Sequence, residues 1–302
     1  MATHEMTGHG DNISANTLFH FTPTLSNLEN IIENGIKIGY SIENYESLIK
    51  GGQEVGMPMI CFCDIPLSRI KYHVSKYGGY AIGLNKSWGI QNKVTPVIYT
   101  HGNSPATELL NEIYSNIQSF IEIHDKYKFK PLSKKNKSLL ESLMDNYEKI
   151  YRESDFEHKK EVNDLVVELK KKISVIFRYV KPYKGKFFRR GAYLEDEIEF
   201  YNEKEWRFVP TKKELAAGGL KDSYEIPLIV SPKYKRAIGI KCGKIRLRFS
   251  PADIRFLIVK NENEIPVLID HIDSIKFDKA SSKTIQILKT KIISLQQVID
   301  DL

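Results

Sequence analysis

Short apolar segments dominate the first hundred residues. The segment Thr17 to Phe21 is almost wholly apolar, which is typical of a buried strand, and Met57 to Cys63 follows the same pattern. Two more strands are predicted at Gly79 to Leu84 and at Val94 to Thr100. A helix between the first two strands is indicated by apolar residues three and four positions apart, ending at Gly35.

From about residue 104 the apolar residues recur at helical spacing instead. We expect three helices in a lysine-rich insertion at about 104–180. The apolar residues of the three predicted helices are Leu109, Ile113, Ile117 and Phe120; Leu139, Leu143, Tyr147 and Ile150; and Leu165, Leu169, Ile173 and Ile176.

Strand patterns return after the insertion. We predict strands at Glu205 to Pro210, Arg236 to Lys241, Lys244 to Phe249 and Arg255 to Lys260, the middle two joined by a tight hairpin. A C-terminal helix at about 283–300 would carry an apolar seam from Ile285 to Ile299. Residues 1–16 are polar and predict a flexible lead-in. The remainder, 17–302, is expected to form a single α+β domain.

Composition narrows the class of protein. The chain has no run of 18 apolar residues, and its start lacks the charged and apolar regions of a signal peptide, so we expect no membrane span and a cytoplasmic location. Three cysteines are few and odd in number, which favours a reducing compartment over a disulfide scaffold.

The formal net charge is +7 and the sequence pI is about 9.0, which favours polyanionic partners. The stretch Lys181 to Arg190 mixes cations with aromatic residues, a composition suited to single-stranded nucleic acid. A solvated loop is the alternative, and an acidic run from Glu195 to Glu205 follows at once. The candidate nucleic-acid-binding residues are Lys181, Lys184, Lys186, Arg189 and Arg190. Further basic clusters occur at 134–137, 170–172, 233–236 and 244–248.

Two glutamates, Glu203 and Glu205, are the candidate catalytic residues. If both lie in an extended strand, their carboxylates share one face. A carboxylate in a partly dry cleft stabilises the positive charge that develops when a glycosidic bond breaks. The competing interpretation is a structural ion pair, with Arg207 on the same face as the neutralising cation.

His20 lies inside the first apolar strand, where its ring could bond a ribose hydroxyl or a carboxamide. A buried structural histidine is the alternative. Cys61, Cys63 and Cys242 are too few for a four-sulfur zinc site, and nothing in the sequence pairs a thiol with a base, so we expect neither a metal nor thiol catalysis.

Several of these segments together resemble the AbiGi-type abortive-infection proteins of bacteria. The resemblance covers most of the chain except the helical insertion. The matching segments are Leu18-Phe19-His20-Phe21-Thr22, Pro58 to Ser68, Tyr77 to Leu84, Trp88-Gly89, Pro96 to Tyr99, Phe200 to Arg207 and Asp253-Ile254-Arg255.

At greater distance the layout is similar to ADP-ribosyltransferases. That resemblance implies a split β-sheet core with NAD as co-substrate and no metal. It implies that Glu205 is the catalytic glutamate and that Glu203 positions the acceptor. The residues that it places at NAD are His20, Phe21, Thr22, Tyr77 and Tyr80.

The combined prediction is a phage-defence ADP-ribosyltransferase that modifies RNA or protein and is controlled by a cognate antitoxin or another defence-system partner. One alternative is a non-enzymatic antitoxin or assembly component, and a second is a plain nucleic-acid-binding module. Candidate docking surfaces for the partner are the helical insertion and the Ile285 to Ile299 seam.

Overall fold

The computed structural model describes residues 15–49, 52–129, 149, 153, 156–189, 192–278 and 280–301. The chain divides into two compact units. The first takes in residues up to 44, 54–99 and from 183 onward, and the second takes in 45–53 and 100–182. The predicted insertion at about 104–180 therefore falls within the second unit. Most of the predicted flexible lead-in, residues 1–14, lies outside the described residues.

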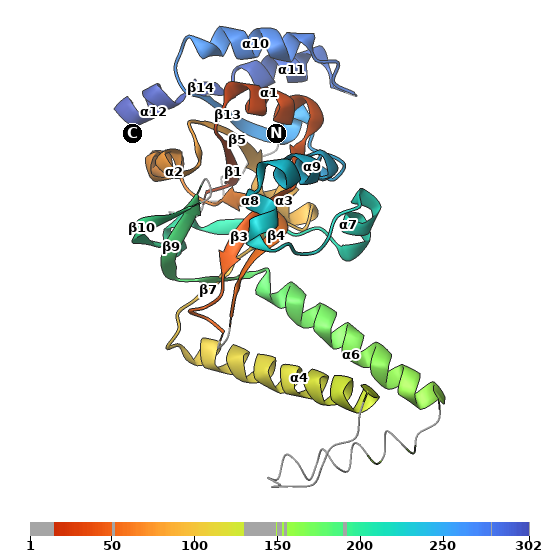
Figure 1. The fold of residues 1–302 in the computed structure, drawn as a ribbon. Coiled ribbons are helices and arrows are strands. Elements are labelled where there is room, and N and C mark those ends of the chain that lie inside the picture. Colours follow the sequence, from red (N-terminus) through yellow and green to blue (C-terminus); the bar gives the residue numbers. More distant parts are fainter. Residues whose placement is uncertain are drawn as a thin grey trace, which may run out of the picture. The chain divides into compact units, whose positions relative to one another are not determined.

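The first unit is built on an eight-stranded sheet (Figure 1). Its strands run in the order β14, β13, β5, β1, β4, β11, β6, and β3 also pairs with β4. Within the described residues, the neighbouring strands of this sheet are antiparallel except β13 with β14. The strands are β1 (Thr17–Thr22), β3 (Gly39–Asn44), β4 (Glu54–Cys63), β5 (Tyr80–Asn85), β6 (Thr95–Pro96), β11 (Glu205–Phe208), β13 (Ile254–Val259) and β14 (Ile292–Ser294).

Helices cover both faces of this sheet. Leu28 of α1 and Leu268 of α10 pack on one face together with Phe62 and Ile82 of the sheet. Ile70 of α2 packs on the other face, beside α12. The helices of this unit are α1 (Leu25–Asn34), α2 (Ile70–Tyr77), α3 (Lys86–Gln91), α7 (Lys212–Gly218), α8 (Ile226–Val230), α9 (Pro232–Cys242), α10 (Glu264–Ser274), α11 (Ser282–Lys289) and α12 (Leu295–Asp301).

Helix α1 ends where the sequence places a glycine. Gly35 has φ 81°, a left-handed value that other residues rarely adopt, and its N–H donates to the Ile31 carbonyl. A Cβ atom at this position would lie 2.6 Å from the Leu247 carbonyl oxygen. The glycine thus allows β2 (Ile36–Lys37) to follow directly and to pair with β12 (Arg246–Leu247).

The second unit contains the helices α4 (Pro105–Phe129) and α6 (Phe156–Phe177), which run antiparallel (Figure 1). The rings of Tyr114 and Phe177 meet at a centroid distance of 5.4 Å. The Tyr45 hydroxyl donates to the Phe177 carbonyl at 2.7 Å. The middle helix predicted around 139–150 lies outside the described residues, apart from residue 149.

The chain passes between the units at β7 (Ile98–Thr100) and β8 (Val180–Pro182). A separate hairpin of β9 (Lys184–Arg189) and β10 (Ala192–Glu199) follows. Short 3-10 turns, η1 (Leu67–Arg69), η2 (Phe200–Glu203) and η3 (Pro251–Asp253), connect other elements.

The α+β class and the strands predicted near 17, 57, 79, 205 and 255 are confirmed. Two later predictions are wrong. The predicted strand at Arg236 to Lys241 is part of helix α9, and the predicted hairpin after it does not form. The single helix predicted at 283–300 is divided into α11, β14 and α12, because Ile292 to Ser294 adds an edge strand beside β13. Among the described residues, no helix combines the length and hydropathy needed to cross a bilayer.

Candidate functional site

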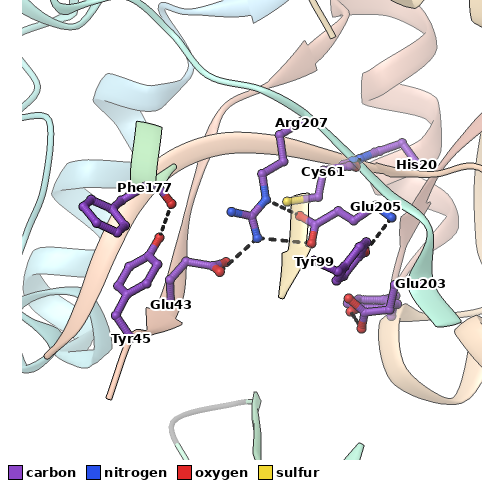
Figure 2. Close-up of polar contacts among 10 residues, drawn as sticks. His20, Glu43, Tyr45, Cys61, Tyr99, Phe177, Glu203, Glu205 and Arg207 are labelled. Carbon is purple, nitrogen blue, oxygen red and sulfur yellow. Dashed lines mark hydrogen bonds and ion pairs between the residues drawn. The ribbon is translucent and has the colours of Figure 1, made fainter. Parts of the chain in front are cut away.

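A buried ion cluster lies where β3 and β11 both pair with β4 (Figure 2). Arg207 Nε donates to Glu205 Oε1 at 2.7 Å, and Arg207 Nη2 donates to Glu205 Oε2 at 3.1 Å. The same Nη2 donates to Glu43 Oε2 at 2.9 Å. The Arg207 side chain is fully buried, and Glu205 is 4% exposed. The predicted alternative for Glu205, an ion pair with Arg207, is therefore present.

The two carboxylates keep the guanidinium charged in spite of its burial. Burial alone would lower the pKa of Arg207, but Glu205 and Glu43 outweigh it and raise that pKa well above its usual value. Burial, and next to it the charge of Glu205, raise the pKa of the Cys61 thiol well above its usual value. The cluster thus holds ionised partners around a thiol that stays protonated, which is an environment for structural bonding rather than for a thiolate nucleophile.

Glu203 and Glu205 do not share a strand face. Between them Lys204 has φ 44° and ψ 49°, so the backbone turns left-handed there. Glu203 consequently ends the turn η2, and β11 begins at Glu205, whose N–H donates to the Tyr99 hydroxyl at 2.8 Å. The extended geometry predicted for the pair is wrong, because the strand starts one residue after this turn.

Glu203 has its own buried partners. Its carboxylate accepts a hydrogen bond from the Tyr77 hydroxyl. Burial, followed by the Glu203 charge, raises the pKa of Tyr77 well above its usual value. His73, which is 1% exposed, stacks on Tyr77 and on Phe21, and burial lowers its pKa although Glu203 acts in the opposite direction. This group was not predicted as a unit. Tyr77 and Phe21 were predicted at NAD, and Glu203 was predicted to position the acceptor.

His20 bonds backbone rather than a side chain. Its Nδ1 lies 2.8 Å from the Cys61 carbonyl oxygen, and the centroid of its ring lies 5.7 Å from that of Phe62. Burial lowers the pKa of His20, and the Cys61 carbonyl partly offsets that effect. His20 is therefore held as a neutral ring at neutral pH. Figure 2 shows it beside Cys61, whose side chain lies toward Glu205.

The strand register separates His20 from Glu205. Phe19 pairs with Cys63, and Cys63 pairs with Glu205, so these three side chains share one face of the sheet. His20 follows Phe19 and is directed to the opposite face, where Phe62 lies. The His20 ring and the Glu205 carboxylate, which the resemblance to ADP-ribosyltransferases places at one site, therefore lie on opposite faces of the sheet.

The other residues predicted at NAD are also dispersed. Thr22 is buried, and Phe21 stacks on His73. The Tyr80 hydroxyl donates to Glu264 Oε1 at 2.7 Å, and burial together with this bond raises the Tyr80 pKa to about 12. With Glu205 closed by Arg207 and His20 on the other face, these residues do not fit a bound dinucleotide. In the described part of the chain, no cluster of histidine, cysteine or carboxylate side chains could hold a metal ion.

The stretch predicted to bind nucleic acid is charge-paired. In the hairpin, Lys184 pairs with Glu199 and Lys186 with Glu197, and Lys184 Nζ lies 3.4 Å from Glu197 Oε2. The abrupt change of charge sign in the sequence reflects these two facing strands. Lys181 is buried, the Arg189 side chain cannot be described, and Arg190 lies outside the described residues.

Sequence reasoning missed three residues of the ion cluster region. Glu43 was not considered, Tyr99 was not singled out, and Cys61 was considered only as a ligand or nucleophile. One feature of the sequence could have drawn attention to Glu43: it is an acidic residue next to Ile42 in a short strand. Nothing in the sequence, however, places that strand close to β11.

The fold and the ion cluster define an α+β protein whose fully buried Arg207 is paired with two buried carboxylates. Comparison with known proteins gives its family. Residues 38–260 match the family model described as "Putative abortive phage resistance protein AbiGi, antitoxin", and the chain belongs to this AbiGi family. The matched range includes Glu43, Cys61, Glu205 and Arg207, whereas His20 lies outside it.

One relative is the "Abortive phage resistance protein AbiGi" of Lactococcus lactis subsp. cremoris. It is 29% identical over 224 residues, which cover 67% of this chain and 71% of the relative. No solved structure matches the chain. The resemblance to AbiGi proteins is thus confirmed, and the more distant resemblance to ADP-ribosyltransferases stays a prediction.

Proposed function

We propose that this chain is the antitoxin-type component of an abortive phage-resistance system and that it acts by binding a protein partner, not by turning over NAD. The observation that carries the proposal is the environment of Glu205. Both of its carboxylate oxygens accept hydrogen bonds from Arg207, and the residue is almost fully buried. A catalytic carboxylate must reach its substrate, and this one is occupied. The family description, which names an antitoxin, supports the same choice.

The partner is the toxin component of the same system, and the surface that we assign to it is one side of the α4 and α6 pair. Tyr114 and Phe177 mark the contact between the two helices. Ile113 and Ile176 each precede a contact position by one residue, which is a rotation of about 100° around each helix. Because the helices are antiparallel, these rotations bring both side chains to the same side of the pair.

Apolar residues are exposed along this side. Ile113 is 44% exposed and Ile176 is 48% exposed. Leu109 and Leu165 project to the same side by the same helical geometry and are more exposed still. An apolar surface that extends over two helices is typical of a protein interface, and a helix of the partner could lie along it.

Co-expression tests the proposal. The chain should relieve the growth inhibition caused by the toxin component of its system and should co-elute with that protein. Ile113→Asp combined with Ile176→Asp should abolish both effects, because a charge in an apolar interface is not compensated. Ile240→Asp, at an apolar position on α9 that is more exposed still, is the control and should leave both unchanged. Full neutralisation by the double variant would exclude this surface.

The NAD-dependent transferase is the second candidate. One observation favours it: Cys61 contacts both His20, predicted at NAD, and Glu205, predicted as the catalytic residue. Its carbonyl oxygen bonds His20 and its thiol bonds Glu205. Activity would require Glu205 to leave Arg207. A nicotinamide-release assay separates the two candidates.

A further inference from the structure

A second cluster of basic residues lies in the segment from Ser231 to Ser250. This segment contains seven lysine or arginine residues and no aspartate or glutamate. It comprises helix α9, a short turn and strand β12. The seven cationic residues are Lys233, Lys235, Arg236, Lys241, Lys244, Arg246 and Arg248.

Six of the seven cations are exposed. Arg246 is the exception, because it donates to the carbonyls of Gly243 and Gly35 and so fixes the turn after α9. Within the described part of the chain, none of the six forms a salt bridge. This distinguishes the segment from the β9–β10 hairpin, where acidic residues face the lysines.

The helix is anchored so that its charged side faces outward. Ile238 and Cys242 are buried in the core of the first unit. Lys233, Arg236 and Ile240 lie on the opposite side of α9 by helical spacing, and Ile240 is 69% exposed. Lys37 of β2 is also exposed and pairs in register with Arg246, which adds another cation at the end of the surface.

An aromatic ring lies among these charges. Tyr234 is 49% exposed, and Lys241 follows it two helical turns later on the same side of α9. Unpaired cations neutralise phosphates, and an exposed ring provides a face for an unstacked base. A lipid surface would need several apolar side chains to insert, and this helix exposes only Ile240 beside Tyr234.

We infer that helix α9 and the segment to Arg248, which we call the α9 basic surface, bind the phosphate backbone of single-stranded nucleic acid, with Tyr234 stacking on a base. This site is separate from the paired stretch at 184–199 and independent of the proposed toxin-binding surface. The binding would be largely independent of base sequence, since backbone contacts and stacking do not read base edges.

The test is a fluorescence anisotropy titration of a labelled, mixed-sequence single-stranded RNA with the full chain at about 50 and 200 mM salt. Lys233→Gln, Arg236→Gln and Lys241→Gln together should weaken binding at least about tenfold and lower the salt slope by about 2, the value for three lost phosphate contacts on a single strand. Tyr234→Ala alone should weaken binding at least about fivefold.

A matched control removes three lysines that are ion-paired. Lys172, Lys184 and Lys212 pair with Glu168, Glu197 and Asp222, so their replacement by Gln lowers the net charge equally at exposed positions. This control should bind within about twofold of the unchanged chain. Equal weakening by both triple variants would overturn the proposal, as would wild-type protein that binds vesicles of anionic lipid but not RNA.

Discussion

Arg207 is a charged residue with no access to water, and its two carboxylate partners explain how it is tolerated. A buried ion pair contributes little net stability compared with apolar residues, but removal of one partner leaves an uncompensated charge. If Glu205 has a structural role, replacing a member of the cluster should lower the stability of the fold. In an enzyme with Glu205 as a catalytic residue, the same replacement would lower mainly the activity.

Arg207→Met should lower the free energy of unfolding by about 3–5 kcal/mol, because two buried carboxylates lose their cation. Urea unfolding of the purified chain measures this. Arg255→Met, at an exposed arginine of β13, is the control and should change stability by less than about 0.5 kcal/mol. If the two variants unfold at the same urea concentration, the cluster is not structural.

Two histidines, the buried His73 and the partly buried His20, predict a dependence of stability on pH. The pKa values of His20 and His73 are lowered in the folded state, so below about pH 6.5 the unfolded chain binds more protons than the folded one. Stability should be full above that pH and should be lost as pH falls toward the folded pKa values, by up to about 1.4 kcal/mol per pH unit for each histidine. His73→Phe should reduce the slope between pH 7.5 and 5.5, and an unchanged slope would contradict this.

At the scale of single elements, apolar spacing predicted which segments are helices better than it predicted which side of each is buried. In α6 the sequence placed Leu165, Leu169, Ile173 and Ile176 along one apolar face. The structure buries Val166, Ile173 and Phe177 and exposes Leu165 and Ile176. The helix carries more apolar residues than one contact needs, so spacing alone could not select the buried side.

Replacement of two isoleucines in α6 tests this orientation. Ile173→Ala should cost about 2–5 kcal/mol, because it leaves a cavity among buried residues. Ile176→Ala should change stability by less than about 0.5 kcal/mol, since its side chain is half exposed. Thermal unfolding followed by circular dichroism gives both values, and equal losses would favour the face predicted from sequence.

Other elements show what a sequence pattern leaves open. The order Arg236-Ala-Ile-Gly-Ile-Lys241 alternates as a strand does, but helix α9 forms because Ile238 and Cys242, four residues apart, pack into the same core. The left-handed Lys204 carries no composition signal, so the sequence could not reveal the turn that separates Glu203 from β11.

At the scale of the whole molecule, the long-range pairings were beyond sequence reasoning. Arg207 was recognised as a possible neutraliser of Glu205 because the two residues are neighbours in one strand. Glu43 could not be recognised, since it lies 164 positions away and joins the cluster only through the pairing of β3 and β11 with β4. The same holds for the basic residues. The lysines of β9 face acidic residues of β10, a pairing that the sequence did not show, whereas the α9 basic surface has no such acidic neighbours.

The two units divide the proposed roles of the molecule. The first holds the buried cluster and the α9 basic surface, and the second exposes the apolar side of α4 and α6. A binding protein can carry separate surfaces of this kind without a catalytic cleft. We infer that Glu205 serves the fold and not a reaction.

The most direct measurement is nicotinamide release from labelled NAD by the purified full chain and by Glu205→Gln, with unfolding curves for both proteins. We predict no release above background from either protein and a lower free energy of unfolding for Glu205→Gln. Release by the unchanged chain that disappears in an equally stable Glu205→Gln variant would contradict this and would establish Glu205 as a catalytic residue.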